Sequence, residues 1–116
     1  MNIQEYELNI KGISHNMYYR IFRNRYVISK VGKDFRTNVL NLFNNIPNKI
    51  CHAVPVKVAI EFCFKDKRKR DLDNLTKSIL DACKKIIYAD DSLIYELVTK
   101  KISGDCDKIK IKIEVI

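Results

Sequence analysis

Residues 54–64 read VPVKVAIEFCF, and this stretch decides the fold. Apolar side chains stand at every second position, at Val54, Val56, Val58, Ile60, Phe62 and Phe64. A period of two places them all on one face of a β-strand. Pro55 lacks a backbone N–H and fits only near the beginning of such a strand or at a sheet edge. The stretch therefore predicts a strand with one face against a core.

Two helical patterns flank this strand. The first recurs at Val31, Phe35, Val39, Leu42, Phe43 and Ile46, and it predicts a helix over residues 30–46 with Ser29 as N-cap. The second recurs at Leu75, Ile79, Ala82, Cys83 and Ile86, and it predicts a helix over residues 74–87 with Asp73 as N-cap.

The remaining segments complete an α+β domain. Residues 5–10, 93–102 and 108–116 alternate as strands do, residues 26–29 suggest a short strand, and residues 14–25 have the composition of a loop. We therefore expect one small domain over residues 1–116, with a mixed β-sheet and two amphipathic helices packed on it.

Composition favours a nucleic-acid partner. Lys and Arg number 22 against 14 acidic residues, a formal charge of +8. The four cysteines form no C-x-x-C pair and the chain has only two histidines, which argues against zinc and for reduced thiols. No signal peptide or membrane-spanning run is present, so we expect a soluble, cytoplasmic protein without a membrane partner or small-molecule cofactor.

The chemistry is concentrated in residues 65–91. A basic run (Lys65, Lys67, Arg68, Lys69 and Arg70) is followed by Asp71 and Asp73, and later by the pair Asp90 and Asp91. In an extended segment Asp71 and Asp73 would point the same way, and a strand returning beside the first would bring the later pair toward them. Carboxylates gathered among basic residues are typical ligands of a hard divalent cation, so we expect Mg²⁺, with Mn²⁺ as a possible substitute. Spacing alone leaves a second, purely structural interpretation open. The first aspartates would then serve as an N-cap, the basic run would be a solvated loop, and the later pair would belong to a polar turn.

Lys77 lies on the same helix face as Asp73 and Asn74. Its ammonium would reach a phosphate bound by the metal, or it forms only an ordinary i,i+4 ion pair with Asp73. Asp81 continues this face, and there a solvated helix residue is a simpler interpretation than a group that positions Lys77.

Arginines and tyrosines interleave near the N-terminus. Arg20, Arg23 and Arg25 are candidates for DNA contacts, and aromatic rings beside them can stack on unpaired bases. The alternative is packing on the sheet with the hydroxyl at the surface. We expect packing for Tyr26, and both interpretations stay open for Tyr18 and Tyr19.

These residues resemble a known family. RDLDNLTKSILDA (70–82) and ADDSLI (89–94) resemble the signature of the RusA-type crossover junction endonucleases, and the central motif is highly specific. Outside it, VPVKVAIEF (54–62) and SHNMYYR (14–20) resemble flanking segments of the family, so the resemblance covers nearly the whole chain.

The resemblance implies a RusA-like homodimer that binds four-way (Holliday) DNA junctions and cuts them by paired, Mg²⁺-dependent nicks in recombination and repair. Asp71, Asp73 and Asp91 match its catalytic, metal-binding aspartates, and Lys77 matches its essential lysine. Lys67, Arg68, Lys69 and Arg70 are the expected DNA contacts of the basic run. Residues 83–89 are one residue shorter than the family pattern, which keeps Asp90 open as an alternative to Asp91.

Two other functions compete with this one. A non-catalytic DNA-binding or architectural protein would keep the fold but gain nothing from carboxylates that face phosphate. A metal nuclease that acts on other branched DNA, or on RNA, would need the same residues.

Overall fold

The computed structural model describes residues 3–116, so the first two residues of the expected domain lie outside it. The elements are β1 (Ile3–Leu8), α1 (His15–Tyr18), β2 (Tyr19–Phe22), β3 (Arg25–Ile28), α2 (Lys30–Asn44), β4 (Val56–Phe64), α3 (Leu72–Cys83), a 3₁₀ turn η1 (Asp91–Leu93), β5 (Ile94–Ser103) and β6 (Lys108–Val115). The expected α+β class is confirmed.

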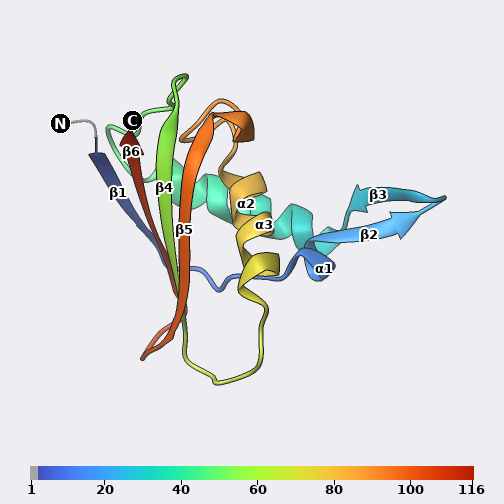
Figure 1. Ribbon diagram of the computed structural model, residues 1–116. Coiled ribbons are helices and arrows are strands. Elements are labelled where there is room, and N and C mark those ends of the chain that lie inside the picture. Colours follow the sequence, from blue (N-terminus) through green and yellow to red (C-terminus); the bar gives the residue numbers. More distant parts are fainter. Residues whose placement is uncertain (1–2) are drawn as a thin grey trace.

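A four-stranded mixed sheet forms the body of the molecule, in the order β1-β6-β4-β5 (Figure 1). β4 is antiparallel to β6 and parallel to β5. The helices α2 and α3 cover one face, on which the alternating residues of β4 are buried as predicted. The other face is charged, and Glu7, Lys110, Glu61 and Lys100 lie in one row across the four strands.

The sequence correctly predicts where α2 begins. The Ser29 hydroxyl accepts a hydrogen bond from the Gly32 backbone N–H at 2.9 Å, which satisfies a free donor of the first turn. A Cβ at Gly32 would lie only 2.2 Å from the carbonyl oxygen of Tyr18. The close contact of α2 with α1 therefore requires glycine at this position.

The beginning of α3 differs from the prediction. Asp71 is the N-cap, with extended backbone (φ −77°, ψ 119°), and Asp73 lies inside the first turn. The Asp71 carbonyl already accepts the first helical hydrogen bond, from Leu75 N–H at 3.1 Å. The expectation that Asp71 and Asp73 belong to an extended segment was therefore wrong.

Residues 14–25 are not a loop. They form α1 and most of a β-hairpin, β2–β3, which projects from the body of the molecule (Figure 1). Arg23 and Asn24 connect its strands with positive φ values of 50° and 60°. Two such residues make the type I′ turn that suits the twist of a two-residue hairpin.

The return of β5 also differs from the expectation. β5 does lie beside β4, but it begins opposite Val56 and ends opposite Phe64. A parallel return requires the chain first to travel back along α3, about 18 Å for its 12 residues. The turn η1, which Asp90 caps and Asp91 begins, consequently lies at the opposite end of α3 from its first turn, where Asp71 and Asp73 stand (Figure 1).

Candidate functional site

The basic run is held in a fixed shape by one acidic residue within it, Asp66. Arg70 donates to both carboxylate oxygens of Asp66, at 2.6 and 3.0 Å. The Arg68 backbone N–H adds a hydrogen bond at 3.1 Å and the Lys11 ammonium an ion pair at 3.3 Å. A bidentate arginine–carboxylate pair holds both groups in one plane. We call the contacts of Asp66 with Arg70, Arg68 and Lys11 the Asp66 clamp.

The clamp divides the basic residues into two kinds. The Arg70 side chain is only 15% exposed and its guanidinium lies 4.0 Å from the centre of the Phe64 ring, so it is a structural residue. Lys67, Arg68 and Lys69 are exposed, and no ion pair ties their side chains to any described residue. These three side chains are free to meet a phosphate backbone.

The Asp66 clamp makes the stability of the fold depend on pH in the acid range. Hydrogen bonds from the Arg70 side chain, and then from the Arg68 backbone, hold the pKa of Asp66 well below its ordinary value of 3.8. A carboxylate whose pKa is lowered by folding stabilises the fold fully when the pH is above the ordinary pKa. This stabilisation is lost as the pH falls through the lower pKa of the folded state. We therefore expect the melting temperature of Asp66→Asn to fall less on acidification below pH 3.8 than that of the wild type.

Scanning calorimetry over a pH series measures this difference, with the exposed Asp105→Asn as the control. Parallel curves for Asp66→Asn and the wild type would mean that the clamp adds no stability.

The head of α3 presents two carboxylates directly after the basic run. Asp71 makes no capping hydrogen bond with its side chain, and Asp73 is 82% exposed. The Lys77 ammonium lies 3.8 Å from an Asp73 oxygen, a loose ion pair at i,i+4. The hydroxyl of Ser78 anchors the same helix by donating to the Ile13 carbonyl. Exposed oxygens and an ammonium thus stand on a fixed helix end.

Asp91 lies in different surroundings, at the far end of α3. Desolvation raises its pKa, and the charges of Asp81 and Asp90 add to this effect, while Lys84 opposes it. Asp90 is occupied within its own turn: Ser92 donates to it from its backbone at 3.0 Å and from its hydroxyl, and Lys84 lies 3.4 Å away. Asp90 caps η1, whereas the Asp91 carboxylate makes no hydrogen bond or ion pair with a described residue.

Asp81 has a role that neither expectation described. It accepts a hydrogen bond from the hydroxyl of Tyr18 and forms an ion pair with Arg36 at 3.1 Å. Tyr18 is completely buried and Asp81 is 24% exposed, so this network joins α1, α2 and α3. Asp81 is therefore neither a solvated residue nor a partner of Lys77, and Tyr18 is a core residue that cannot stack on bases.

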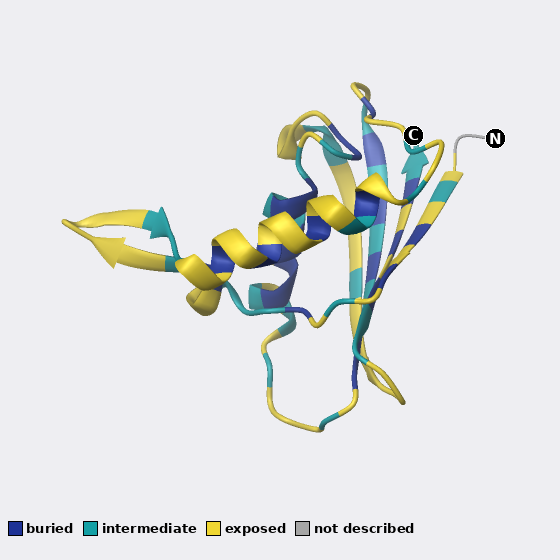
Figure 2. Ribbon diagram, turned by 180° about the vertical axis from the view of Figure 1, so that it is seen from behind, coloured by how far each residue is buried: buried dark blue, intermediate teal, exposed yellow. Residues whose placement is uncertain are grey.

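The two faces of the hairpin differ. Arg20, Phe22, Arg25 and Val27 share one face by register, with the guanidinium groups of Arg20 and Arg23 each 5.2 Å from the Phe22 ring centre. The other face carries Tyr19, Ile21, Tyr26 and Ile28. Tyr26 is 72% exposed, so the expected packing of this residue was wrong. Tyr19 is half-buried against Tyr18, and Figure 2 shows the outer part of the hairpin as exposed.

Sequence reasoning missed the Asp66 clamp, the Asp81 network and the hairpin. A signal existed for two of them: Asp66 stands four residues before Arg70, and Arg23-Asn24 separates two short β-prone runs. The Asp81 network joins residues up to 63 positions apart and left no local pattern.

The donor chemistry fits a hard divalent cation only in part. Asp71 and Asp73 offer oxygen ligands, the type that Mg²⁺ prefers. Within residues 3–116, however, no three acidic, histidine or cysteine side chains of the chain are grouped closely enough to hold a metal. One chain thus supplies two of the three predicted ligands at the head of α3 and the third at the other end.

Comparisons with known proteins agree with the motif. The family described as Endodeoxyribonuclease RusA matches residues 9–114. Crossover junction endodeoxyribonuclease RusA of Shigella sonnei (strain Ss046) is 42% identical over 84 residues, 72% of this chain and 70% of the relative. Its counterparts in Escherichia coli (strain K12) and Enterobacteria phage 82 are 40% identical over the same shares. Along the described chain, no helix is long and apolar enough to cross a membrane.

Proposed function

The chain belongs to the RusA family and is an endodeoxyribonuclease that resolves Holliday junctions, and we propose that it acts as a Mg²⁺-dependent homodimer. The observation that supports this proposal is the head of α3. Two exposed carboxylates and the Lys77 ammonium stand there immediately after Lys67, Arg68 and Lys69. Exposed carboxylates beside a phosphate-binding surface repel DNA unless a cation lies between them.

In the proposed site, Asp71, Asp73 and Asp91 hold the metal. A bound Mg²⁺, or Mn²⁺ in its place, would lower the pKa of a water molecule and polarise the scissile phosphate. Lys77 stabilises the negative charge that develops on the phosphate oxygens, because its ammonium is a compact point charge next to Asp73. Lys67, Arg68 and Lys69 hold the DNA backbone, and Arg70 holds the loop that carries them.

The third carboxylate comes from a second subunit. Within one chain the length of α3 separates Asp91 from Asp71 and Asp73. A homodimer supplies a second copy of each end, so Asp91 of the partner subunit can complete the site. Two such sites related by a two-fold axis suit the paired nicks that a junction requires.

Mixing two inactive variants tests this assembly. We expect Asp73→Asn and Asp91→Asn to be inactive alone, and a co-refolded mixture to nick junctions, because one of the two sites in the mixed dimer keeps all three carboxylates. The nicks should be unpaired, since the other site carries both changes. Mixtures that stay inactive although mass spectrometry detects the mixed dimer would contradict a shared site.

We also propose that the basic hairpin binds DNA phosphates through Arg20, Arg23 and Arg25. Each phosphate neutralised on duplex DNA contributes about 0.9 to the slope of log affinity against log salt. Arg23→Ala should therefore lower the magnitude of the junction-binding slope by about 0.9. Lys112→Ala, which removes the same charge from the open sheet face, serves as the control. Equal slopes for Arg23→Ala and the wild type would remove the hairpin tip from the DNA interface.

A further inference from the structure

The loop between β4 and α3 is held at both of its ends by the part of the chain that forms β5 and the turn after it. At its beginning, the Lys65 backbone N–H donates to the Asp107 carboxylate at 3.0 Å. At its end, the Lys101 ammonium donates to the Arg70 carbonyl at 2.5 Å. The second contact lies directly before Asp71, and the function proposed above gives it no role.

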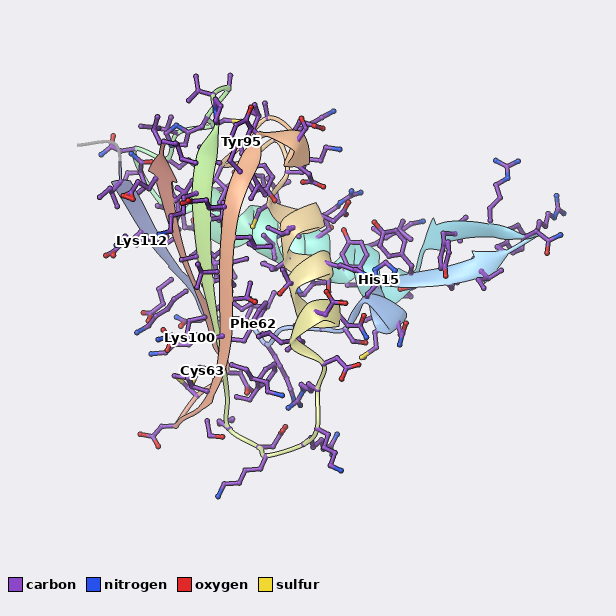
Figure 3. All side chains as sticks on the ribbon, in the orientation of Figure 1. His15, Phe62, Cys63, Tyr95, Lys100 and Lys112 are labelled. Carbon is purple, nitrogen blue, oxygen red and sulfur yellow. The ribbon has the colours of Figure 1, made fainter. Side chains whose placement is uncertain are left out.

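Lys101 reaches this carbonyl because of its place in the sheet. In the parallel pairing of β4 and β5 it stands opposite Phe62, whose side chain is buried beneath the helices. Successive side chains of a strand alternate between the two faces, so Lys101 lies on the helix side of β5 and Lys100 on the charged open face. In Figure 3, the labelled Phe62 and Lys100 lie at about the height of the first turn of α3. The side chain of Lys101 therefore starts beside the head of α3.

The Arg70 carbonyl lies outside the hydrogen-bond ladder of α3. Asp71 is the N-cap, and its own carbonyl accepts the first helical hydrogen bond, from the Leu75 N–H. Lys101 thus supplies a donor to the carbonyl one residue earlier, and a charged donor makes a stronger hydrogen bond than a neutral one. Because Asp66 also holds the guanidinium, Arg70 is fixed at both its side chain and its carbonyl. The peptide group that leads into Asp71 therefore has a fixed orientation.

Lys101 holds the backbone and not the carboxylate. Among the contacts within residues 3–116, no ion pair joins Lys101 to an acidic side chain. A lysine bound to the Asp71 oxygens would compete with a metal cation, because both are positive and need the same oxygens. Holding the preceding carbonyl directs the Asp71 side chain and leaves its oxygens open.

We propose that Lys101 is a positioning residue of the nuclease site, which acts through the Arg70 carbonyl on the direction of the Asp71 carboxylate. This role rests on the proposed function of Asp71 as a metal ligand, and it does not require Lys101 to touch DNA. A misplacement of about 1 Å, caused by a change away from the chemistry, can slow a reaction by about 10²-fold. Loss of the Lys101 bond should therefore affect the cleavage rate far more than the fold.

Replacing Lys101 with methionine tests this role, with Lys100→Met as the matched control. Methionine keeps an unbranched apolar side chain but has no donor. Both variants lose one positive charge from adjacent positions of β5, so junction affinity should fall equally in the two. The single-turnover cleavage rate should fall by about 10²-fold only in Lys101→Met. Lys101→Arg, which keeps a charged donor, should recover part of that rate. A Lys101→Met rate equal to that of Lys100→Met, or a loss confined to junction affinity, would overturn the proposal.

Limited proteolysis with trypsin reports on the loop without any cleavage of DNA. Trypsin cuts after lysine and arginine, and the loop at residues 65–70 carries exposed residues of both kinds. Cutting there should be several-fold faster in Lys101→Met than in Lys100→Met, while cutting in the β2–β3 hairpin stays the same. Equal cutting of the loop in the two variants would overturn the proposal even where junction cleavage is impaired. Faster loop cutting in Lys101→Met, together with a wild type that fails to cleave junctions with Mg²⁺, would support the anchoring contact and count against the proposed function.

Discussion

Replacing Lys77 with alanine should lower the single-turnover rate of junction cleavage by a factor on the order of 10²–10³, the usual effect of losing one preorganised charge-stabilising group. The fold should not suffer, because the Asp73–Lys77 pair is loose and exposed. Exposed i,i+4 pairs stabilise a protein by only about 0.3–0.5 kcal/mol. Single-turnover measurement at saturating protein separates chemistry from binding.

Two variants sharpen this test. Lys77→Arg keeps the charge but spreads it over a planar group, so activity should return only in part. Lys30→Ala removes the lysine of another exposed i,i+4 pair, with Asp34 at 3.2 Å on α2, and should leave cleavage unchanged. A wild-type rate in Lys77→Ala would show that this lysine is an ordinary surface residue.

Replacing Asp73 with asparagine should reduce cleavage by at least about 10²-fold, because losing several kcal/mol of metal-based stabilisation slows the reaction tenfold for each 1.4 kcal/mol. Junction affinity should stay the same or rise, since one negative charge near the phosphate is removed. The variant should remain folded, because Asp71 and not Asp73 is the N-cap of α3.

Electrophoretic mobility shifts and circular dichroism check affinity and fold on the same preparation. Asp34→Asn, which removes the acidic partner of the control pair on α2, should bind and cut as the wild type does. Normal cutting by Asp73→Asn would exclude this carboxylate from the site.

The elements of the fold could be predicted because each carries its own period. The alternation in β4 and β6 and the apolar stripes of α2 and α3 are local signals, and burial of one face is enough to fix them. The order of the strands has no such signal. β5 alternates much like a buried strand, although the structure places it at an edge with Leu97 and Val98 exposed.

Local sequence patterns could predict only one part of the candidate site. Asp71, Asp73 and Lys77 lie within seven consecutive residues, so the helix itself brings them together. The place of Asp91 depends on the direction of β5, which is a long-range property of the sheet. The hairpin was mistaken for a loop because arginines occupy positions that apolar residues usually fill in a strand.

The most direct test of metal-dependent junction resolution compares a synthetic four-way junction with a linear duplex of the same sequence, using purified wild-type protein with Mg²⁺ and with EDTA. Strand-specific labels report where each strand is cut. We expect symmetric, paired nicks in the junction, few in the duplex and none in EDTA. Binding without cleavage, equal cutting of both substrates, or cutting that persists in EDTA would contradict a metal-dependent, junction-selective nuclease.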